Sequence, residues 1–326
     1  MSDSDQSEHA GRHGPGANAA VGPGAADPSA RAGFVALIGA PNAGKSTLIN
    51  QLVGAKVAIV THKAQTTRAP IRGIAIEGGS QLIFVDTPGI FKPRRRLDRA
   101  MVHSALGAAA DADVVVLLID ALRGVEEDTE RILDKLGEIR APRLLALNKI
   151  DKAQKPALLA LTTSLTARLP FAAVFMISAL SGDGVADLRR HLAGLVPQGH
   201  WLYPADEISD APMRALAAEI TREKLYLRLH EELPYISTVE TTQWTELAPG
   251  KGVRIEQTIF VERDSQKQIV IGKGGHTIKE LSMASRKELA EILEMPVHLF
   301  LFVKVRESWA DDPERYREMG LEFPEK

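Results

Sequence analysis

The chain has 326 residues, of which 44% are apolar and 25% charged, and its formal net charge is −2. This composition is typical of an ordinary globular protein, and the length suggests two domains of about 150 residues each. A chain so close to neutral is not a general nucleic-acid binder, so any such surface must be local. The sequence contains no cysteine, which excludes disulfides, zinc–thiolate sites and cysteine nucleophiles and fits a cytosolic protein. It also contains no apolar run near the roughly 20 residues that span a bilayer.

Residues 1–32 are rich in Gly, Ala, Pro, Ser and Asp, and apart from Met1 and Val21 they include no large apolar residue. Such a segment buries too little surface to offset the entropy of ordering it, so we expect a disordered extension. A secretory signal would need an apolar stretch, and a transit peptide would avoid the acidic residues found here.

Residues 33–200 alternate between apolar strands and amphipathic helices. The pattern predicts strands at 34–38, 71–76, 82–85, 114–119, 144–147 and 174–177, and helices at 45–53, 97–110, 127–139, 157–168 and 185–195. Nearly continuous apolar strands between helices indicate an α/β domain whose mostly parallel sheet is covered on both faces. Ligands of such sheets bind outside the carboxyl ends of the strands.

Proline and glycine interrupt this pattern and predict a linker at residues 201–210. Residues 211–326 form the second predicted domain. They read as a helix at 211–233, strands at 236–244 and 253–261, a helix at 278–293 and a strand at 297–305. A polar tail that contains Trp309 and Tyr316 closes the chain.

The first motif lies where the first predicted strand meets the first helix, and it fits G-x-x-x-x-G-K-[ST]. Its glycines let backbone amides and the helix N-terminus surround a phosphate. We expect Lys45 to reach the β- and γ-phosphates and Ser46 to bind Mg²⁺. The predicted phosphate-binding residues are Gly39, Ala40, Pro41, Asn42, Ala43, Gly44, Lys45, Ser46 and Thr47.

Asp86-Thr87-Pro88-Gly89 follows an apolar strand, where a carboxylate that supports Mg²⁺ through its water shell belongs. The Gly89 amide is placed to sense the γ-phosphate, although a Pro-Gly turn is common in any loop. Residues 61–70 form a polar loop without helix or strand pattern. A threonine from this loop would complete Mg²⁺ coordination only while the γ-phosphate is bound, which makes the loop a switch. We expect this ligand to be Thr67, with Thr66 as the alternative.

Asn148-Lys149-Ile150-Asp151 indicates which base is bound. The Asp151 carboxylate can accept from N1–H and N2–H₂ of guanine, a donor pair that adenine lacks, which argues against an ATP-dependent phosphotransferase. The Asn148 amide can face N7 and O6, and the lysine stem can lie along the ring. Backbone amides at Ser178-Ala179 are placed to meet O6. Alone, such residues at a strand end are more often turn residues.

Gly272-Lys273-Gly274-Gly275 fits the G-x-x-G loop that clamps a nucleic-acid backbone. Residues 263–287 include six basic and two acidic residues, the last of them Lys287, which gives a local net charge of 6 − 2 = +4. This concentration favours a single-stranded nucleic-acid groove. The alternatives are a strand-to-helix turn and a protein-interaction module. The predicted RNA-binding residues are Gly272, Lys273, Gly274, Gly275, Lys267, Lys279 and Arg286.

Together these motifs resemble those of the Era family, bacterial GTPases joined to a KH domain. The likeness extends over about residues 33–322 and rests on segments 39–46, 65–68, 86–90, 148–151, 177–179, 234–237, 271–275 and 303–307. It implies a P-loop GTPase domain followed by an α+β type II KH domain, with GTP/GDP and Mg²⁺ as cofactors. It further implies a cytoplasmic protein that binds the 3′ end of 16S rRNA, assists maturation of the 30S ribosomal subunit and associates peripherally with the inner membrane. We expect a monomer.

Ile90 occupies the position where Ras-like proteins carry a glutamine that orients the attacking water. An isoleucine cannot hydrogen-bond that water. We therefore expect slow intrinsic GTP hydrolysis that RNA or the ribosome accelerates by reordering the switch loops.

Overall fold

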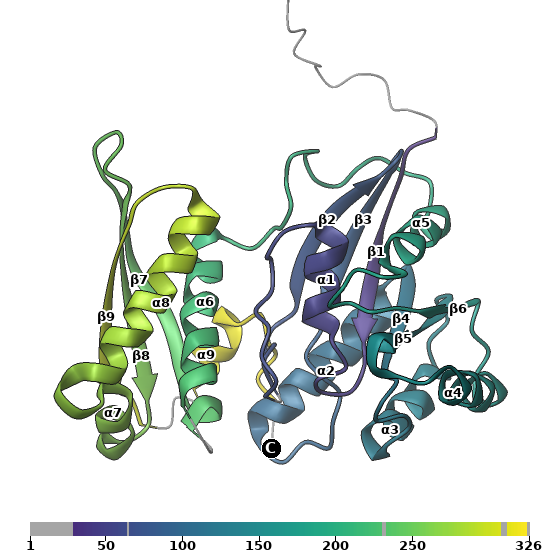
Figure 1. Cartoon of the computed structure of the whole chain (residues 1–326), viewed down its shortest axis with the longest axis horizontal. Coiled ribbons are helices and arrows are strands. Elements are labelled where there is room, and N and C mark those ends of the chain that lie inside the picture. Colours follow the sequence, from purple (N-terminus) through teal and green to yellow (C-terminus); the bar gives the residue numbers. More distant parts are fainter. Residues whose placement is uncertain (1–28, 64, 230–232, 308–311, 325–326) are drawn as a thin grey trace, which may run out of the picture.

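The computed structural model describes residues 29–63, 65–229, 233–307 and 312–324. Two α/β units lie side by side in it (Figure 1). The first is a six-stranded sheet of order β2-β3-β1-β4-β5-β6, parallel throughout except for β2. Its elements are β1 (Arg31–Ile38), α1 (Lys45–Val53), β2 (Ile71–Glu77), β3 (Ser80–Asp86), α2 (Arg96–Asp111), β4 (Val114–Asp120), α3 (Glu127–Leu136), β5 (Arg143–Asn148), α4 (Lys155–Arg168), β6 (Ala173–Met176) and α5 (Val185–Leu195). The predicted mostly parallel sheet is confirmed.

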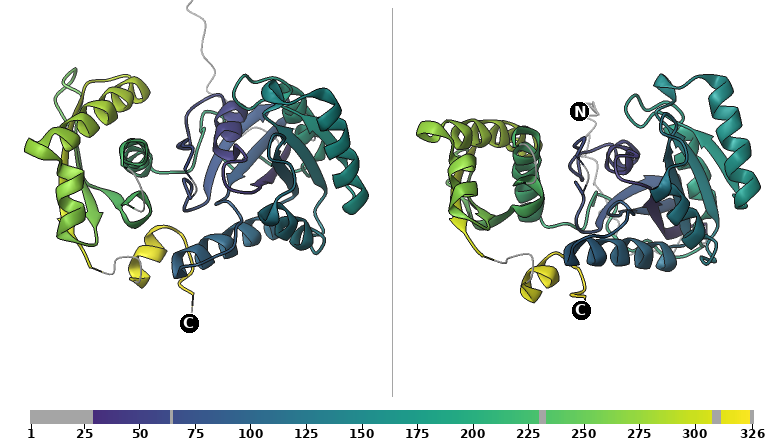
Figure 2. Two further views of the ribbon diagram at one scale, coloured as in Figure 1. Left: turned by 60° about the horizontal axis from the view of Figure 1, so that its bottom comes forward. Right: turned by 90° about the horizontal axis from the view of Figure 1, so that it is seen from below.

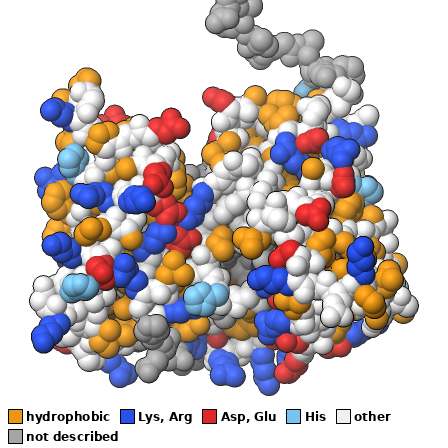
Figure 3. Space-filling model, in the orientation of Figure 1, with side chains coloured by type: hydrophobic (Ala, Val, Ile, Leu, Met, Phe, Trp, Pro, Cys, Tyr) orange, Lys and Arg blue, Asp and Glu red, His pale blue; other side chains and the backbone are white. Residues whose placement is uncertain are grey.

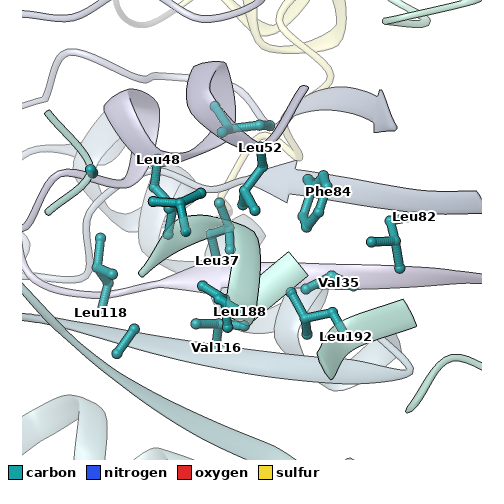
Figure 4. Packing of buried hydrophobic residues seen from close by; sticks show 14 of the residues in the cluster. Val35, Leu37, Leu48, Leu52, Leu82, Phe84, Val116, Leu118, Leu188 and Leu192 are labelled. Atoms are coloured by element: carbon teal, nitrogen blue, oxygen red, sulfur yellow. The ribbon is translucent and has the colours of Figure 1, made fainter. Parts of the chain in front are cut away.

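Helices cover both faces of this sheet because its central strands β1, β4 and β5 carry polar side chains only at their ends. All seven residues of β4 are buried. On one face α1 and α5 pack Leu48, Leu52 and Leu188 against the sheet (Figure 4), and on the other face α2, α3 and α4 cover a second apolar cluster. This arrangement directs the carboxyl ends of β1, β3, β4 and β5 to one edge, where the sequence motifs fall.

The second unit is a three-stranded sheet of order β7-β8-β9, with helices packed on one face. Its helix α6 lies between this sheet and the first unit (Figure 2). The elements are α6 (Met213–Arg228), β7 (Thr238–Glu246), β8 (Val253–Val261), α7 (Asp264–Ile271), α8 (His276–Leu293), β9 (Val297–Val305) and α9 (Pro313–Glu318). Short 3₁₀ turns occur at η1 (Ile150–Lys152), η2 (Leu233–Ile236) and η3 (Lys273–Gly275). None of the helices in the described ranges is both long and apolar enough to cross a bilayer.

The structure corrects four details of the sequence analysis. β1 begins at Arg31, which pairs with Ser80, so the predicted extension 1–32 is too long at its end, and residues 1–28 lie outside the described part. The helix predicted at 211–233 spans Met213–Arg228 instead. The second glycine loop follows the helix α7 rather than a strand, because residues 269–271 complete a helix begun at Asp264.

The fourth correction concerns the tail, which was read as merely polar. It contains α9 and packs against α2 of the first unit through a fully buried Tyr316 (Figure 2). Trp309 lies outside the described residues.

Candidate functional site

The phosphate loop connects β1 to α1, and its shape depends on glycine. Gly44 has φ 102°, and a Cβ there would lie 2.3 Å from Nδ2 of Asn148. No other residue fits this position, because it requires both a left-handed backbone and a close approach. The loop thereby brings the start of α1 against the end of β5, as the two motifs predicted.

Lys45 closes the loop from inside. Its side chain is buried, and Nζ donates to the carbonyl oxygens of Gly39 and Ala40 at 3.1 Å each. Burial lowers the pKa of Lys45 to about 8, although the nearby Asp86 partly offsets this effect. A buried cation held mainly by carbonyl dipoles is poorly compensated, so an anion in the loop would stabilise its charged form.

Three oxygen-bearing side chains converge beside the loop. Ser46 Oγ donates to Asp86 Oδ2 at 2.7 Å and lies 2.9 Å from Thr67 Oγ1, which itself donates to Asp86 Oδ2 at 3.1 Å. Asp86 is fully buried, and within the described chain its second oxygen, Oδ1, has no hydrogen-bond partner. Burial raises the pKa of Asp86, against the effects of Lys45, Ser46 and Thr67.

The side-chain oxygens of Ser46, Thr67 and Asp86 suit Mg²⁺, which prefers oxygen ligands and keeps several bound waters. The unpartnered Asp86 oxygen is where a magnesium-bound water would be held. Thr67 is the threonine at this position, because the Thr66 hydroxyl instead meets Thr61 Oγ1 at 2.7 Å and donates to the Lys63 carbonyl at 2.8 Å. The geometry therefore favours Thr67 over Thr66.

A cavity of about 290 Å³ opens between the phosphate loop and the 61–70 loop, and Gly89 and Lys149 also line it. The side chains of three other predicted residues make contacts within the protein. Thr87 is buried and donates its hydroxyl to the Leu37 carbonyl at 2.8 Å, and Ile90 is buried in the core. Ile150 also packs against that core. Their side chains support the loops.

The predicted base-binding residues form one connected group. Asn148 donates through Nδ2 to the Ala43 carbonyl at 2.8 Å and accepts from the Ala179 amide at 2.9 Å. Ser178 Oγ donates to Asp151 Oδ1 at 2.7 Å. The amide of Asn148 thus ties three separate motifs together, and Ser178 orients the carboxylate that was predicted to read guanine.

Asp120 is a residue of the site that the sequence analysis did not predict, and it is identified by its contact with Lys149. Lys149 adopts φ 68°, and its Nζ contacts Asp120 Oδ2 at 2.6 Å and the Asn42 carbonyl at 2.9 Å. Asp120 ends β4, beside the end of β5. The available signal was a carboxylate at the end of an apolar strand, on the edge where the other motifs meet. Asp120 fixes the lysine stem across the pocket.

The second glycine loop joins α7 to α8. Gly272, Gly274 and Gly275 all have positive φ, and Lys273 is exposed between them. A Cβ on Gly272 would lie 2.2 Å from Oγ1 of Thr277, so the turn requires glycine.

Beside this loop, a groove of about 310 Å³ runs between α8 and β9. Lys279 and Arg286 line it together with the exposed ring of Phe300. Lys267 lies on α7 outside this groove. Two of the predicted basic residues therefore share one concave surface with an aromatic ring, and basic side chains are visible on this part of the second unit in Figure 3.

Comparisons with known proteins agree with both units. A family model described as 50S ribosome-binding GTPase matches residues 34–149, and one described as KH domain matches residues 232–310. GTPase Era of Mesorhizobium japonicum is 63% identical over 91% of this chain and 96% of that relative. GTPase Era of Brucella suis is 62% identical over 90% of this chain and 94% of that relative.

Two solved structures are similar over both units. One is Era in complex with MgGDPNP and nucleotides 1506–1542 of 16S ribosomal RNA, and the other is a variant of Aquifex aeolicus Era bound to GDP·AlF₄⁻. Each has a TM-score of 0.84 and 37% identity, and each match covers 89% of this chain and 99% of the other. The predicted resemblance is confirmed, and the chain belongs to the Era family of GTPases.

Proposed function

We propose that this GTPase hydrolyses GTP as a switch that controls its binding to the 3′ end of 16S rRNA, and so assists maturation of the 30S subunit. The observation that carries the proposal is the placement of Thr67 beside Ser46 and Asp86 in a loop that also contacts the second unit. A relative at 37% identity holds MgGDPNP and a 16S rRNA segment together, which supports the pairing of nucleotide and RNA.

In the proposed mechanism, phosphate oxygens lie against the amides of the 39–46 loop and the Lys45 ammonium. Ser46 and Thr67 would hold Mg²⁺ directly, and Asp86 would hold it through water. When bound, Mg²⁺ neutralises charge that develops on the phosphates. The Gly89 amide meets the γ-phosphate, and loss of that group releases Gly89 and Thr67. Asn148, Lys149, Asp151, Ser178 and Ala179 select guanine.

Slow intrinsic hydrolysis is part of the proposal. Ile90 is 3% exposed within the core, and an apolar side chain offers the attacking water no hydrogen bond. RNA bound at residues 272–275 would accelerate the reaction by ordering the 61–70 loop. We further propose that the protein is cytoplasmic and monomeric. Its peripheral association with the inner membrane remains a prediction from the family resemblance.

The RNA part of the proposal is tested by reversing two charges at the second glycine loop. Lys273→Glu with Lys279→Glu should weaken binding of a 16S rRNA 3′ fragment by about tenfold or more and reduce its salt dependence, because phosphate contacts release counterions. Lys135→Glu with Arg140→Glu, at exposed positions of the first unit, makes an equal charge change and should leave binding unaltered.

Affinities are compared with a GTP analogue and with GDP, and single-turnover hydrolysis is measured with and without the RNA fragment. Tighter binding in the GTP-analogue state and faster hydrolysis with RNA support the switch. Normal RNA affinity in the Lys273/Lys279 variant would favour the alternative, in which the second unit is a protein-interaction module.

A further inference from the structure

The 61–70 loop is held mainly by the second unit. Arg222 of α6 donates through Nη2 to the carbonyl oxygen of Thr66 at 2.5 Å. Arg68 reaches back from the loop and donates to the Ser237 carbonyl at 2.8 Å and to the Tyr226 hydroxyl at 2.9 Å. Both neighbours of Thr67 are therefore fixed by residues outside the GTPase domain.

These contacts form a buried layer of stacked groups. Two guanidinium groups lie close to the ring of Tyr226, with Arg222 Cζ 5.0 Å and Arg68 Cζ 5.8 Å from its centroid. Arg222 is 2% exposed, Tyr226 0% and Arg68 5%. Guanidinium groups over an aromatic face in a site without water interact more strongly than at the surface.

The α6 face is built for this contact. Glu219, Arg222, Glu223 and Tyr226 are spaced so that they lie on one side of the helix. Glu219 accepts from Arg222 Nε at 2.7 Å and sets its direction, and Glu223 Oε1 accepts from the Val60 amide at 2.8 Å. Burial works against the charge of Arg222, but Glu219 outweighs it and raises the pKa of Arg222, so the donor stays charged.

We propose that Arg222 and Tyr226 of the second unit are positioning residues for GTP hydrolysis, because Arg222 holds the carbonyl of Thr66 and Tyr226 holds the side chain of Arg68, the two neighbours of Thr67. Neither side chain lines the cavity between the phosphate loop and the 61–70 loop. Their effect is to keep the Thr67 hydroxyl within reach of Ser46 and Asp86, a placement that a polar loop without regular structure would not maintain by itself. The inference rests on the proposed role of Thr67 in hydrolysis but not on RNA binding.

The α6 face also connects to the RNA-binding side. Lys56 contacts both Glu223 of α6 and Glu288 of α8, and Lys224 of α6 contacts Glu288 as well. Helix α8 begins directly after Gly275, at the glycine loop. A shift of α8 on RNA binding would therefore act on the helix that holds Thr67.

The test uses the full-length chain without RNA. Arg222→Met and Tyr226→Phe are compared with the parent in single-turnover GTP hydrolysis across Mg²⁺ concentrations, and in amide hydrogen exchange of residues 65–69 without nucleotide. We expect Arg222→Met to lower the rate about tenfold, as for a lost charged hydrogen bond, and Tyr226→Phe to lower it about threefold. Both substitutions should raise the Mg²⁺ concentration needed for hydrolysis and the amide exchange rate of residues 65–69. The affinity of each variant for GDP should stay unchanged.

Arg189→Met is the matched control, because Arg189 also donates to backbone carbonyls, those of Leu52 and Ile76, but does not touch the 61–70 loop. It should leave hydrolysis, Mg²⁺ dependence and loop exchange unchanged. Wild-type exchange and wild-type Mg²⁺ dependence in folded Arg222→Met would overturn the proposal, as would faster hydrolysis. If Arg222→Met does not fold, Tyr226→Phe decides by the same criteria, since it keeps the buried ring.

Discussion

The guanine side and the magnesium side of the site are built in different ways. The contacts of Asn148, Lys149 and Asp151 described above all come from the first unit, where Ala43, Asp120 and Ser178 hold them. The 61–70 loop instead has partners in both units: Thr67 meets Ser46 and Asp86 of the first unit, whereas Thr66 and Arg68 are held by α6 and by the segment before β7. On the proposed assignment of these residues, base choice depends on one domain, whereas the geometry of Thr67 depends on two.

Under the proposed function, this difference would let a partner of the second unit change hydrolysis without changing which nucleotide binds. Coupling between two sites requires that they share an element whose arrangement both can bias. The 61–70 loop is such an element, because the nucleotide site and α6 both contact it. The guanine pocket is not, since no described contact of its residues reaches the second unit.

The largest effect is expected at the guanine side. Asp151→Asn should reverse the hydrogen-bond pattern and move preference from GTP toward XTP by roughly 10³-fold, since a site built for specific donors rejects a ligand that lacks them. Competition binding with GTP, XTP and ATP measures this. Asp134→Asn, an exposed position on α3, is the control. Unchanged GTP preference, or undiminished activity on ATP, would contradict the assignment of Asp151.

At the magnesium side, the two adjacent threonines separate the predicted ligand from its neighbour. Thr67→Ala should slow GTP hydrolysis about 100-fold, by removing an oxygen aimed at the site where charge develops. Thr66→Ala removes an equal group that faces Thr61 and should cost less than about threefold by the same measure. Guanine preference should stay unchanged in both. Equal loss in the two variants would show that the loop, rather than the Thr67 hydroxyl, matters.

The sequence predicted the first sheet well because its central strands are apolar between their ends and its motifs have fixed spacing. α1, α5, β8 and β9 were predicted at the bounds that the structure shows. It did not predict α7, because Ile269-Val270-Ile271 is a β-branched run that resembles a strand, and tertiary packing of Val270 overrides that preference.

The contacts between the units could not be predicted from the sequence. Arg222 reads as one more charge on a helix, and its meeting with Thr66, 156 positions away, depends on how the two units pack. Tyr316 gave no signal either, since a single aromatic residue in a polar tail has no periodicity. The sequence analysis preferred Thr67 and kept Thr66 as the alternative, because the physical distinction depends on which hydroxyl turns toward Asp86 and only the structure shows that.

A change in the tail is expected to have the smallest effect, and it tests whether the guanine side is independent of contacts between the two units. Tyr316 packs with Leu97 and Met101 of α2, and the Arg96 guanidinium lies 4.8 Å from the centroid of Phe323. Arg315 contacts Glu240 of β7, so the tail links the second sheet to the helix that follows Asp86–Gly89. The tail therefore packs on α2 of the first unit, in the same way that α6 contacts the 61–70 loop of the first unit.

Tyr316→Ala should therefore release the tail, lower the unfolding midpoint by about 2–4 °C and speed amide exchange in residues 96–101. Guanine preference should not change, and hydrolysis should change by less than about threefold, since none of the contacts given above for the described residues of the tail reaches Ser46, Thr67 or Asp86. Phe302→Ala removes an aromatic ring from the exposed face of β9 and should leave α2 exchange as it is. A large loss of GTP selectivity in Tyr316→Ala would mean that the guanine side is not self-contained, because Tyr316 packs on α2 and does not contact Asn148 or Asp151 in the described structure.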